Sequence, residues 1–241
     1  MILWHVYSCL VSDTHGDYDI HKLTTSAFPD QRNLTRDDVM VIMGDAGVCW
    51  DGGKQDRYIQ RWHENKNYTT LFIRGNHDAI PLIKKLPVVD KFNGKVYQVS
   101  PHVFYTVSGE IYNICGYRCL AINGADSHDM EIRKAGVNWW ADEGVSHEAI
   151  VKAKFKLYEY DNKIDFLFAH TGGSYNTKMI SPTFKPTPSD RELDEILRVA
   201  EFKRFYFGHY HQDKWTRDDC HCLYNNVYEI IDGKERLCRN Y

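Results

Sequence analysis

The segment CLVSDTHGD, at residues 9–17, joins a short apolar run to a cluster of polar side chains. The apolar run predicts a buried strand, and the polar cluster marks the point where that strand ends. In open α/β sheets, ligands bind in the crevice beyond the carboxyl ends of the strands. The carboxylate of Asp13 and the imidazole of His15 are therefore candidate metal ligands, although Asp-x-His alone is a common sequence.

Four more clusters of this kind follow apolar runs elsewhere in the chain. They are Gly44-Asp45, Gly75-Asn76-His77-Asp78, His170-Thr171-Gly172-Gly173 and Gly208-His209-Tyr210-His211. Each cluster alone has an ordinary explanation as a turn or as a satisfied polar group. Their joint occurrence predicts that they converge on one site. Residues i and i+2 of an extended segment point to the same side, so the pairs Asp13/His15 and His209/His211 are each expected to hold one ion.

The predicted ligand set mixes imidazole, carboxylate and one amide oxygen, from Asn76. Such a set suits Mn, Fe, Zn or Ni, whereas an all-oxygen set would favour Mg or Ca. The two carboxylates, Asp13 and Asp45, allow one of them to bridge two ions. Two ions about 3.5–4 Å apart can clamp a phosphate group and activate water. The sequence thus predicts two divalent metal ions, with Mn favoured, and a phosphate-ester substrate.

The five clusters, in this order over residues 13–211, resemble the signature of the calcineurin-like metallophosphoesterase superfamily. The resemblance implies an αββα sandwich, in which two mixed β-sheets are flanked by helices. The implied ligands of the first ion are Asp13, His15, Asp45 and His211, with Asp45 bridging. The implied ligands of the second ion are Asn76, His170 and His209. Hydroxide activated by the ions would attack phosphorus in line with the leaving group, with His77 as general acid and Asp78 orienting His77.

The segment after Asp45 departs from the superfamily pattern. Many members have Gly-Asp-x-x-Asp, often followed by Arg-Gly, whereas this chain reads Gly-Asp-Ala-Gly-Val at residues 44–48. The arginine that protein phosphatases use on their substrate is missing, which favours a phosphodiesterase acting on a small molecule or a nucleotide. The alternatives are a phosphomonoesterase, including a phosphoprotein phosphatase, a protein-interaction scaffold on the same fold, and an oxygen-activating dimetal site.

Candidate substrate-binding residues lie outside the clusters. Arg74 and Arg133 are candidate phosphate ligands, because a guanidinium fork matches phosphate geometry. Trp139 and Trp140 are candidate stacking residues for a flat leaving group. Residues 123–140 resemble a bacterial and phage branch of the superfamily that is mostly uncharacterised. The loops at 125–146 and 172–188 are expected to set the substrate.

Periodicity between the clusters predicts alternating strands and helices, hence an α/β domain with parallel strands. Helices are expected at 55–64 and from Ser146 to Tyr158. A third helix is expected to open with a capping box at Ser189-Asp190-Arg191-Glu192. Residues 95–123 predict an antiparallel meander, and the Pro-rich residues 182–188 predict a loop. A single domain is expected over residues 1–241.

Composition bounds the remaining properties. The chain has 241 residues, 43% of them apolar, and a net charge of −3, so no strongly basic field favours nucleic acid. Residues 1–11 predict a buried first strand rather than a signal peptide, and no run approaches the roughly 20 apolar residues of a membrane span. A cytoplasmic location is expected. The seven cysteines predict buried thiols in a reducing compartment, Cys220 and Cys222 included. The oligomeric state stays open.

Overall fold

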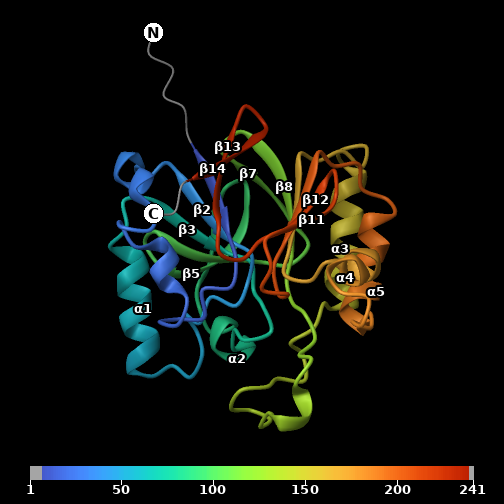
Figure 1. Cartoon of the computed structure of the whole chain (residues 1–241), viewed down its shortest axis with the longest axis horizontal. Coiled ribbons are helices and arrows are strands. Elements are labelled where there is room, and N and C mark those ends of the chain that lie inside the picture. Colours follow the sequence, from blue (N-terminus) through green and yellow to red (C-terminus); the bar gives the residue numbers. More distant parts are fainter. Residues whose placement is uncertain (1–6, 239–241) are drawn as a thin grey trace.

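Two mixed β-sheets pack face to face, and helices cover their outer faces (Figure 1). The computed structural model describes residues 7–238, so the predicted strand at residues 1–11 is described only from Tyr7 onward. Helix α1 (Lys54–Glu64) lies on one outer face, and α3 (His147–Tyr158), α4 (Gly173–Ile180) and α5 (Pro188–Leu197) lie on the other. The expected αββα sandwich is confirmed.

The first sheet has eight strands in the order β14-β13-β1-β2-β3-β6-β5-β4. Strands β1, β2, β3 and β6 are parallel, whereas β13, β14, β5 and β4 extend the sheet by antiparallel pairing. The bounds are β1 Ser8–Val11, β2 Val39–Ile42, β3 Thr69–Phe72, β4 Val88–Lys91, β5 Gly94–Ser100, β6 Val103–Thr106, β13 Val227–Ile231 and β14 Lys234–Cys238.

The second sheet has six strands in the order β11-β12-β10-β9-β8-β7. Its inner strands β12, β10, β9 and β8 are parallel, and the two edge strands pair antiparallel with them. The bounds are β7 Glu110–Ile114, β8 Tyr117–Ile122, β9 Phe166–Ala169, β10 Arg204–Phe207, β11 Lys214–Arg217 and β12 Cys220–Cys222.

The central strands are buried on both faces, which explains why they are continuous apolar runs in the sequence. In β1, Leu10 packs into the core between the two sheets, while Cys9 and Val11 pack into the core on the α1 side. In β9, Phe166 and Phe168 join the core between the sheets. The alternation follows from the period of two along a strand. The parallel strands therefore form a rigid support for the polar clusters at their carboxyl ends.

The predicted meander at residues 95–123 is wrong in one respect. Two antiparallel hairpins form, β5–β6 and β7–β8, but they belong to different sheets. Strand β6 pairs on its free side with β3, and β8 pairs with β9, both in parallel. The chain therefore crosses from one sheet to the other between Thr106 and Glu110. Local alternation predicted the hairpins, but the long-range partners decided which sheet each joins.

Helix ends also differ from the expectation. Helix α3 begins as predicted, with the Ser146 side chain accepting a hydrogen bond from the Ala149 amide. Helix α5 begins at Pro188, and its capping box is formed by Thr187 and Asp190, so the predicted box starting at Ser189 is wrong. Proline at the first position of a helix is favoured because its missing N–H has no partner there anyway. Part of the expected loop at 172–188 is helix α4.

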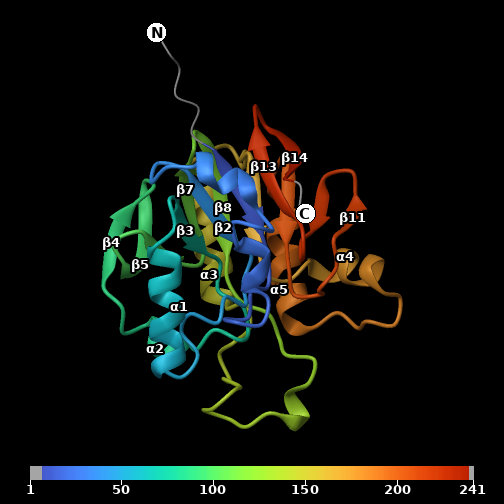
Figure 2. The same ribbon diagram turned by 60° about the vertical axis from the view of Figure 1, so that its left-hand side comes forward.

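The segment between β8 and α3, residues 123–146, leaves the body of the molecule and returns, as the yellow-green trace in Figures 1 and 2 shows. Its only helical turn is η3 (Met130–Ile132). We call it the β8–α3 segment. Within residues 7–238, no helix is long and apolar enough to cross a lipid bilayer.

The cysteines are free thiols, as expected. Cys220 and Cys222 both pack into the core under α3 and α5, because alternate residues of β12 face the same side. His221 between them faces the other way and pairs with Glu235. Burial raises the pKa of the Cys222 thiol, which keeps it a neutral hydrophobic group.

Candidate metal centre

The predicted ligands follow five parallel strands that belong to both sheets. Asp13 and His15 come after β1, Asp45 after β2, and Asn76 after β3 in the first sheet. His170 follows β9, and His209 and His211 follow β10, in the second sheet. Because the two sheets pack face to face, their carboxyl ends place these side chains together.

The side chains form two groups, and the Asp45 carboxylate lies close to both. The ligand atoms of Asp13, His15 and His211 lie within 4.8 Å of one another, as do those of Asp45, His170 and His209. Asp45 Oδ2 lies 3.5 Å from His15 Nε2 and 3.3 Å from His170 Nε2. The Asp45 carboxylate thus lies between the two groups.

Asn76 completes the second group. Its side-chain oxygen Oδ1 lies 3.2 Å from His170 Nε2, and the side chain is buried. The structure therefore brings all seven predicted ligand side chains to one place between the sheets.

A buried carboxylate oxygen without a partner shows that the site suits a cation. Asp13 Oδ1 is buried and accepts no hydrogen bond from the described residues, with His211 Nε2 at 3.4 Å. Burial alone would raise the pKa of Asp13, but the nearby His211 imidazole and the charge of His170 outweigh it and lower the pKa to about 2. A buried ionised oxygen with no donor is costly unless a cation binds it.

Two of the predicted ligand histidines, His170 and His15, show the same excess of negative charge. Burial would lower the pKa of His170, but the Asp45 carboxylate outweighs it and raises the pKa to about 9. The pKa of His15 is likewise raised to about 9, against the effect of burial, by Asp45 and Asp13. Protons on these imidazoles occupy positions that divalent cations can take. Together with the mixed nitrogen and oxygen donors, this fits two divalent cations.

Five of the seven ligand residues have backbone angles that are unusual for residues other than glycine. The φ angles are 53° at Asp13, 42° at His15, 49° at Asp45, 73° at His209 and 51° at His211. Left-handed non-glycine residues are strained and cluster at functional sites. The expectation of extended i, i+2 pairs is therefore wrong. Asp13 and His15 still share a group, but His209 and His211 belong to different groups.

Glycines around the site provide space for the ligands. A Cβ atom on Gly75 would lie 2.1 Å from Asp45 Oδ1, and one on Gly44 would lie 2.1 Å from His170 Nδ1. Both distances are far below van der Waals contact. Any side chain at either position would displace a ligand.

His77 lies beside the centre rather than within the two ligand groups described above. Its Nε2 is 3.9 Å from Asp45 Oδ2 and 2.7 Å from Arg133 Nη2, and its ring stacks on Trp50 with centroids 5.4 Å apart. Burial lowers the pKa of His77, Asp45 opposes this, and the nearby Arg133 charge adds to the lowering. The ligand atoms of His77, His15 and Asp45 also lie within 4.8 Å of one another, as a third group of this kind.

Asp78 has a different role from the expected one. Its carboxylate accepts hydrogen bonds from the amides of Gly75 and Gly47, at 2.9 and 3.2 Å, and from the Tyr105 hydroxyl at 3.0 Å. Burial raises its pKa. Asp78 thus fastens the loop after β2 to the loop after β3. The predicted orientation of His77 by Asp78 does not match these contacts.

The two candidate arginines lie in different surroundings. Arg133, on the β8–α3 segment, lines a cleft of about 730 Å³ with His15, His77 and His211, and pairs with Asp129. Arg74 Nη1 donates to the carbonyls of Gly75 and Glu143, and its Nη2 donates to the carbonyl of Gly144. Arg74 therefore anchors the β8–α3 segment and is not among the residues that line this cleft.

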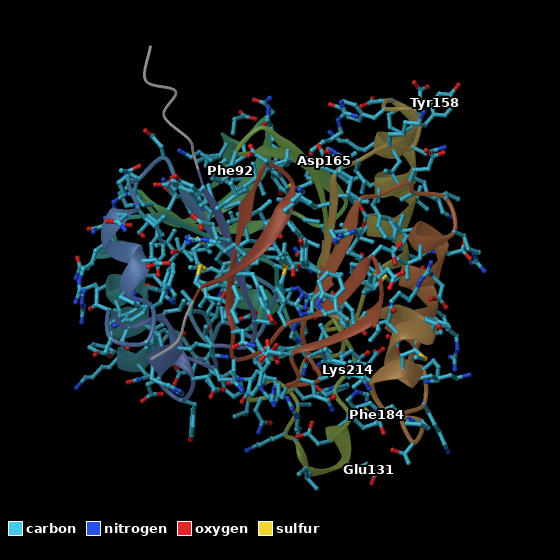
Figure 3. All side chains as sticks on the ribbon, turned by 45° about the horizontal axis from the view of Figure 1, so that its top comes forward. Phe92, Glu131, Tyr158, Asp165, Phe184 and Lys214 are labelled. Atoms are coloured by element: carbon cyan, nitrogen blue, oxygen red, sulfur yellow. The ribbon has the colours of Figure 1, made fainter. Side chains whose placement is uncertain are left out.

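Aromatic residues flank the centre on two sides. Trp140 is buried and packs edge-on against Trp50, at 6.0 Å, while Trp139 is half-buried. His128, on the β8–α3 segment, stacks between His209, at 4.8 Å, and Phe184, at 5.6 Å. Figure 3 shows Glu131, which belongs to the β8–α3 segment, at the same end of the molecule as Phe184. Trp50 was missed in the sequence because it belongs to no recognisable motif. His128 lies in the stretch 123–140 that resembles a branch of the superfamily, but no role was predicted for it.

Comparison with known proteins identifies the family. The model of calcineurin-like phosphoesterases matches residues 9–213, which include all seven ligand positions. No curated protein matches the sequence significantly. A phosphopantetheinyl hydrolase from Mycobacterium tuberculosis is similar in structure, with 13% identity, a TM-score of 0.46, and coverage of 91% of this chain and 88% of that chain.

A dimetal phosphatase from Danio rerio is also similar, with 10% identity, a TM-score of 0.49, and coverage of 98% of this chain and 99% of that chain. Both likenesses are distant and identify no substrate for this chain. The match of the family model over most of the sequence shows that the chain belongs to the calcineurin-like phosphoesterase family.

Proposed function

We propose that this protein is a phosphodiesterase that depends on two divalent metal ions. The observation that carries this proposal is the Asp45 carboxylate, which stands between the two groups of ligand side chains. A carboxylate in this place could bridge two closely spaced ions, which is the arrangement of two-metal phosphoesterase sites. Family membership supports a metal-dependent phosphoesterase, whereas the preference for diesters is our own inference.

The residues proposed to hold the ions form two sets that share Asp45. The first set is Asp13, His15, Asp45 and His211, and the second is Asp45, Asn76, His170 and His209. Manganese suits this mixture of nitrogen and oxygen donors, as do iron, zinc and nickel. When bound, the two ions neutralise charge on the phosphate oxygens and make water nucleophilic at neutral pH.

Arg133 and His77 are proposed to act on the ester itself. Arg133 Nη2 lies 2.7 Å from His77 Nε2, so in this arrangement the guanidinium donates to the imidazole. A phosphate oxygen is a stronger acceptor than a neutral imidazole and competes for the guanidinium. Binding of the ester therefore frees the lone pair of His77 Nε2, which takes up a proton from solvent, and the resulting imidazolium would donate that proton to the leaving oxygen as general acid.

The charge of the cleft favours a diester over a monoester. Arg133 is the only lysine or arginine among the described residues that line the cleft, which also carries five aspartates. They are Asp17, Asp19, Asp51, Asp56 and Asp129. A monoester brings two negative charges near neutral pH and a diester brings one, so the aspartates repel the monoester more strongly.

A substrate comparison tests this preference. With Mn²⁺ present, we expect kcat/KM for bis-p-nitrophenyl phosphate to exceed that for p-nitrophenyl phosphate. A nucleotide diester, thymidine 5′-p-nitrophenyl phosphate, forms the third arm and tests whether a nucleoside is accepted. A higher kcat/KM for the monoester would show a phosphomonoesterase. Absence of hydrolysis in all three arms, with two ions bound, would contradict the proposed function.

Arg133→Ala is expected to raise KM for the diester about 10- to 100-fold, since a hydrogen bond to a charged group contributes about 1.5–3 kcal/mol. Metal content is expected to stay at the wild-type level, because Arg133 contacts His77 and Asp129 and none of the seven ligands. Steady-state kinetics and elemental analysis measure the two quantities. Arg198→Ala, at an exposed arginine after α5, is the matched control. An unchanged KM in Arg133→Ala would remove Arg133 from the proposal.

A further inference from the structure

Asn76 presents a problem that the other ligands do not. An amide has an oxygen end and a nitrogen end of nearly equal size, and only the oxygen can bind a cation. Rotation of the side chain by half a turn would direct an NH₂ group at the second ion. A neighbouring group must therefore distinguish the two ends of the amide.

Ser127 of the β8–α3 segment makes this distinction. Asn76 Nδ2 donates to Ser127 Oγ at 3.1 Å, while Asn76 Oδ1 faces His170 Nε2 at 3.2 Å. A hydroxyl oxygen can accept or donate, so the contact alone does not fix the amide. The direction depends on where the Ser127 hydroxyl proton goes.

Glu143 determines that direction. Its Oε1 accepts the Ser127 backbone amide at 2.6 Å, while its Oε2 is buried and accepts no hydrogen bond from the described residues. A buried carboxylate oxygen without a donor is the acceptor that the Ser127 hydroxyl proton would take, which leaves Ser127 Oγ as an acceptor. It then takes the NH₂ end of Asn76 and leaves the oxygen end for the ion.

Glu143 is itself held by the strand end that carries Asn76. The side chain of Glu143 is 4% exposed, and its backbone carbonyl accepts Arg74 Nη1 at 2.7 Å. The Arg74 carbonyl accepts the amide of Gly124 at 2.8 Å. These contacts tie both ends of the β8–α3 segment to the residue two positions before Asn76. Hydrogen bonds thus run from Arg74 to Glu143, from Ser127 to Glu143 and from Asn76 to Ser127, so they begin and end on the same loop after β3.

We propose that Ser127 and Glu143 are positioning residues that turn the Asn76 oxygen toward the second metal ion. The inference rests on the proposed metal centre and not on the identity of the substrate. Groups that orient a metal ligand typically change metal affinity by about 10- to 100-fold when they are replaced. The effect is confined to the second ion, because Ser127 contacts Asn76 and none of the ligands of the first ion.

Mn²⁺ binding to the purified full-length protein tests the proposal without any substrate. Free Mn²⁺ is measured by electron paramagnetic resonance during a titration. Ser127→Ala is expected to weaken the second Mn²⁺ about tenfold or more, while the first keeps its wild-type affinity. Ser127→Thr keeps the hydroxyl and is expected to bind both ions as the wild type does. Ser26→Ala, at an exposed serine, is the matched control.

Three results would overturn the proposal. They are wild-type affinity for both ions in Ser127→Ala, equal weakening of both ions, and the same loss in the threonine variant as in the alanine variant. If Ser127→Ala does not fold, Ser127→Cys preserves the shape with a much weaker acceptor and is expected to show the same selective loss. The wild-type protein could bind two ions, and Ser127→Ala could weaken the second as expected, while no ester is hydrolysed. That result would refute the proposed function and leave this inference intact.

Discussion

Asp45→Asn is expected to remove the second ion, weaken the first, and lower kcat/KM for diester hydrolysis by about a thousandfold or more. Asp45 Oδ2 lies close to both ligand groups, at 3.5 Å from His15 Nε2 and 3.3 Å from His170 Nε2. A neutral amide cannot supply the negative charge that holds two dications close together. A thousandfold loss corresponds to about 4 kcal/mol of transition-state stabilisation, a magnitude that metal-ion catalysis commonly provides.

Elemental analysis after gel filtration, together with kcat/KM at saturating Mn²⁺, measures both effects of Asp45→Asn. Asp37→Asn makes the same chemical change at an exposed position and serves as the control. Two tightly bound ions and near-normal turnover in Asp45→Asn would show that Asp45 does not bridge. The proposed dimetal centre would then be wrong in its central feature.

His77→Asn is expected to lower kcat for alkyl esters by about 100- to 10,000-fold, which is the contribution of a positioned general acid. Both ions are expected to stay bound. His77 Nε2 lies 3.9 Å from Asp45 Oδ2, farther than the nitrogens of His15 and His170. The loss should depend on the leaving group. A p-nitrophenolate leaves without protonation, so its loss should be small, whereas an alkyl ester needs the proton and should show the full loss.

Two measurements on His77→Asn separate the possible roles of this residue. Loss of a metal ion would show that His77 is a ligand, as its position near His15 and Asp45 would permit. An equal loss of kcat for p-nitrophenyl and alkyl esters would show that His77 does not act as general acid. His147→Asn, at an exposed histidine that pairs with Glu192, controls for the substitution itself.

Much of the fold and the candidate ligand set follows from short-range features of the sequence. An apolar run of four or five residues that ends in a polar cluster predicts a strand and the edge of the sheet where its ligands emerge. Asp13, Asp45 and Asn76 could be placed on this basis because parallel strands share one carboxyl edge. The order of the clusters then identified the family resemblance, which supplied the sandwich and the division of ligands between two ions.

Other features required the long-range partners to be known. The hairpins β5–β6 and β7–β8 read alike in sequence, but pairing with β3 and β9 sends them to different sheets. Asp78 follows His77 directly in the sequence, yet its carboxylate accepts hydrogen bonds from backbone amides of two loops and from the Tyr105 hydroxyl. Neighbours in sequence did not predict neighbours in space.

The sequence alone determined which side chains are able to bind metal. The residue type sets the chemistry of each ligand, and local periodicity predicts where each strand ends. Only the tertiary structure decided how they are aimed. Asp13, Asp45 and His209 sit in left-handed backbone that isolated residues of these types avoid. Surrounding packing and hydrogen bonds between distant segments hold that backbone in place, and no local pattern encodes them.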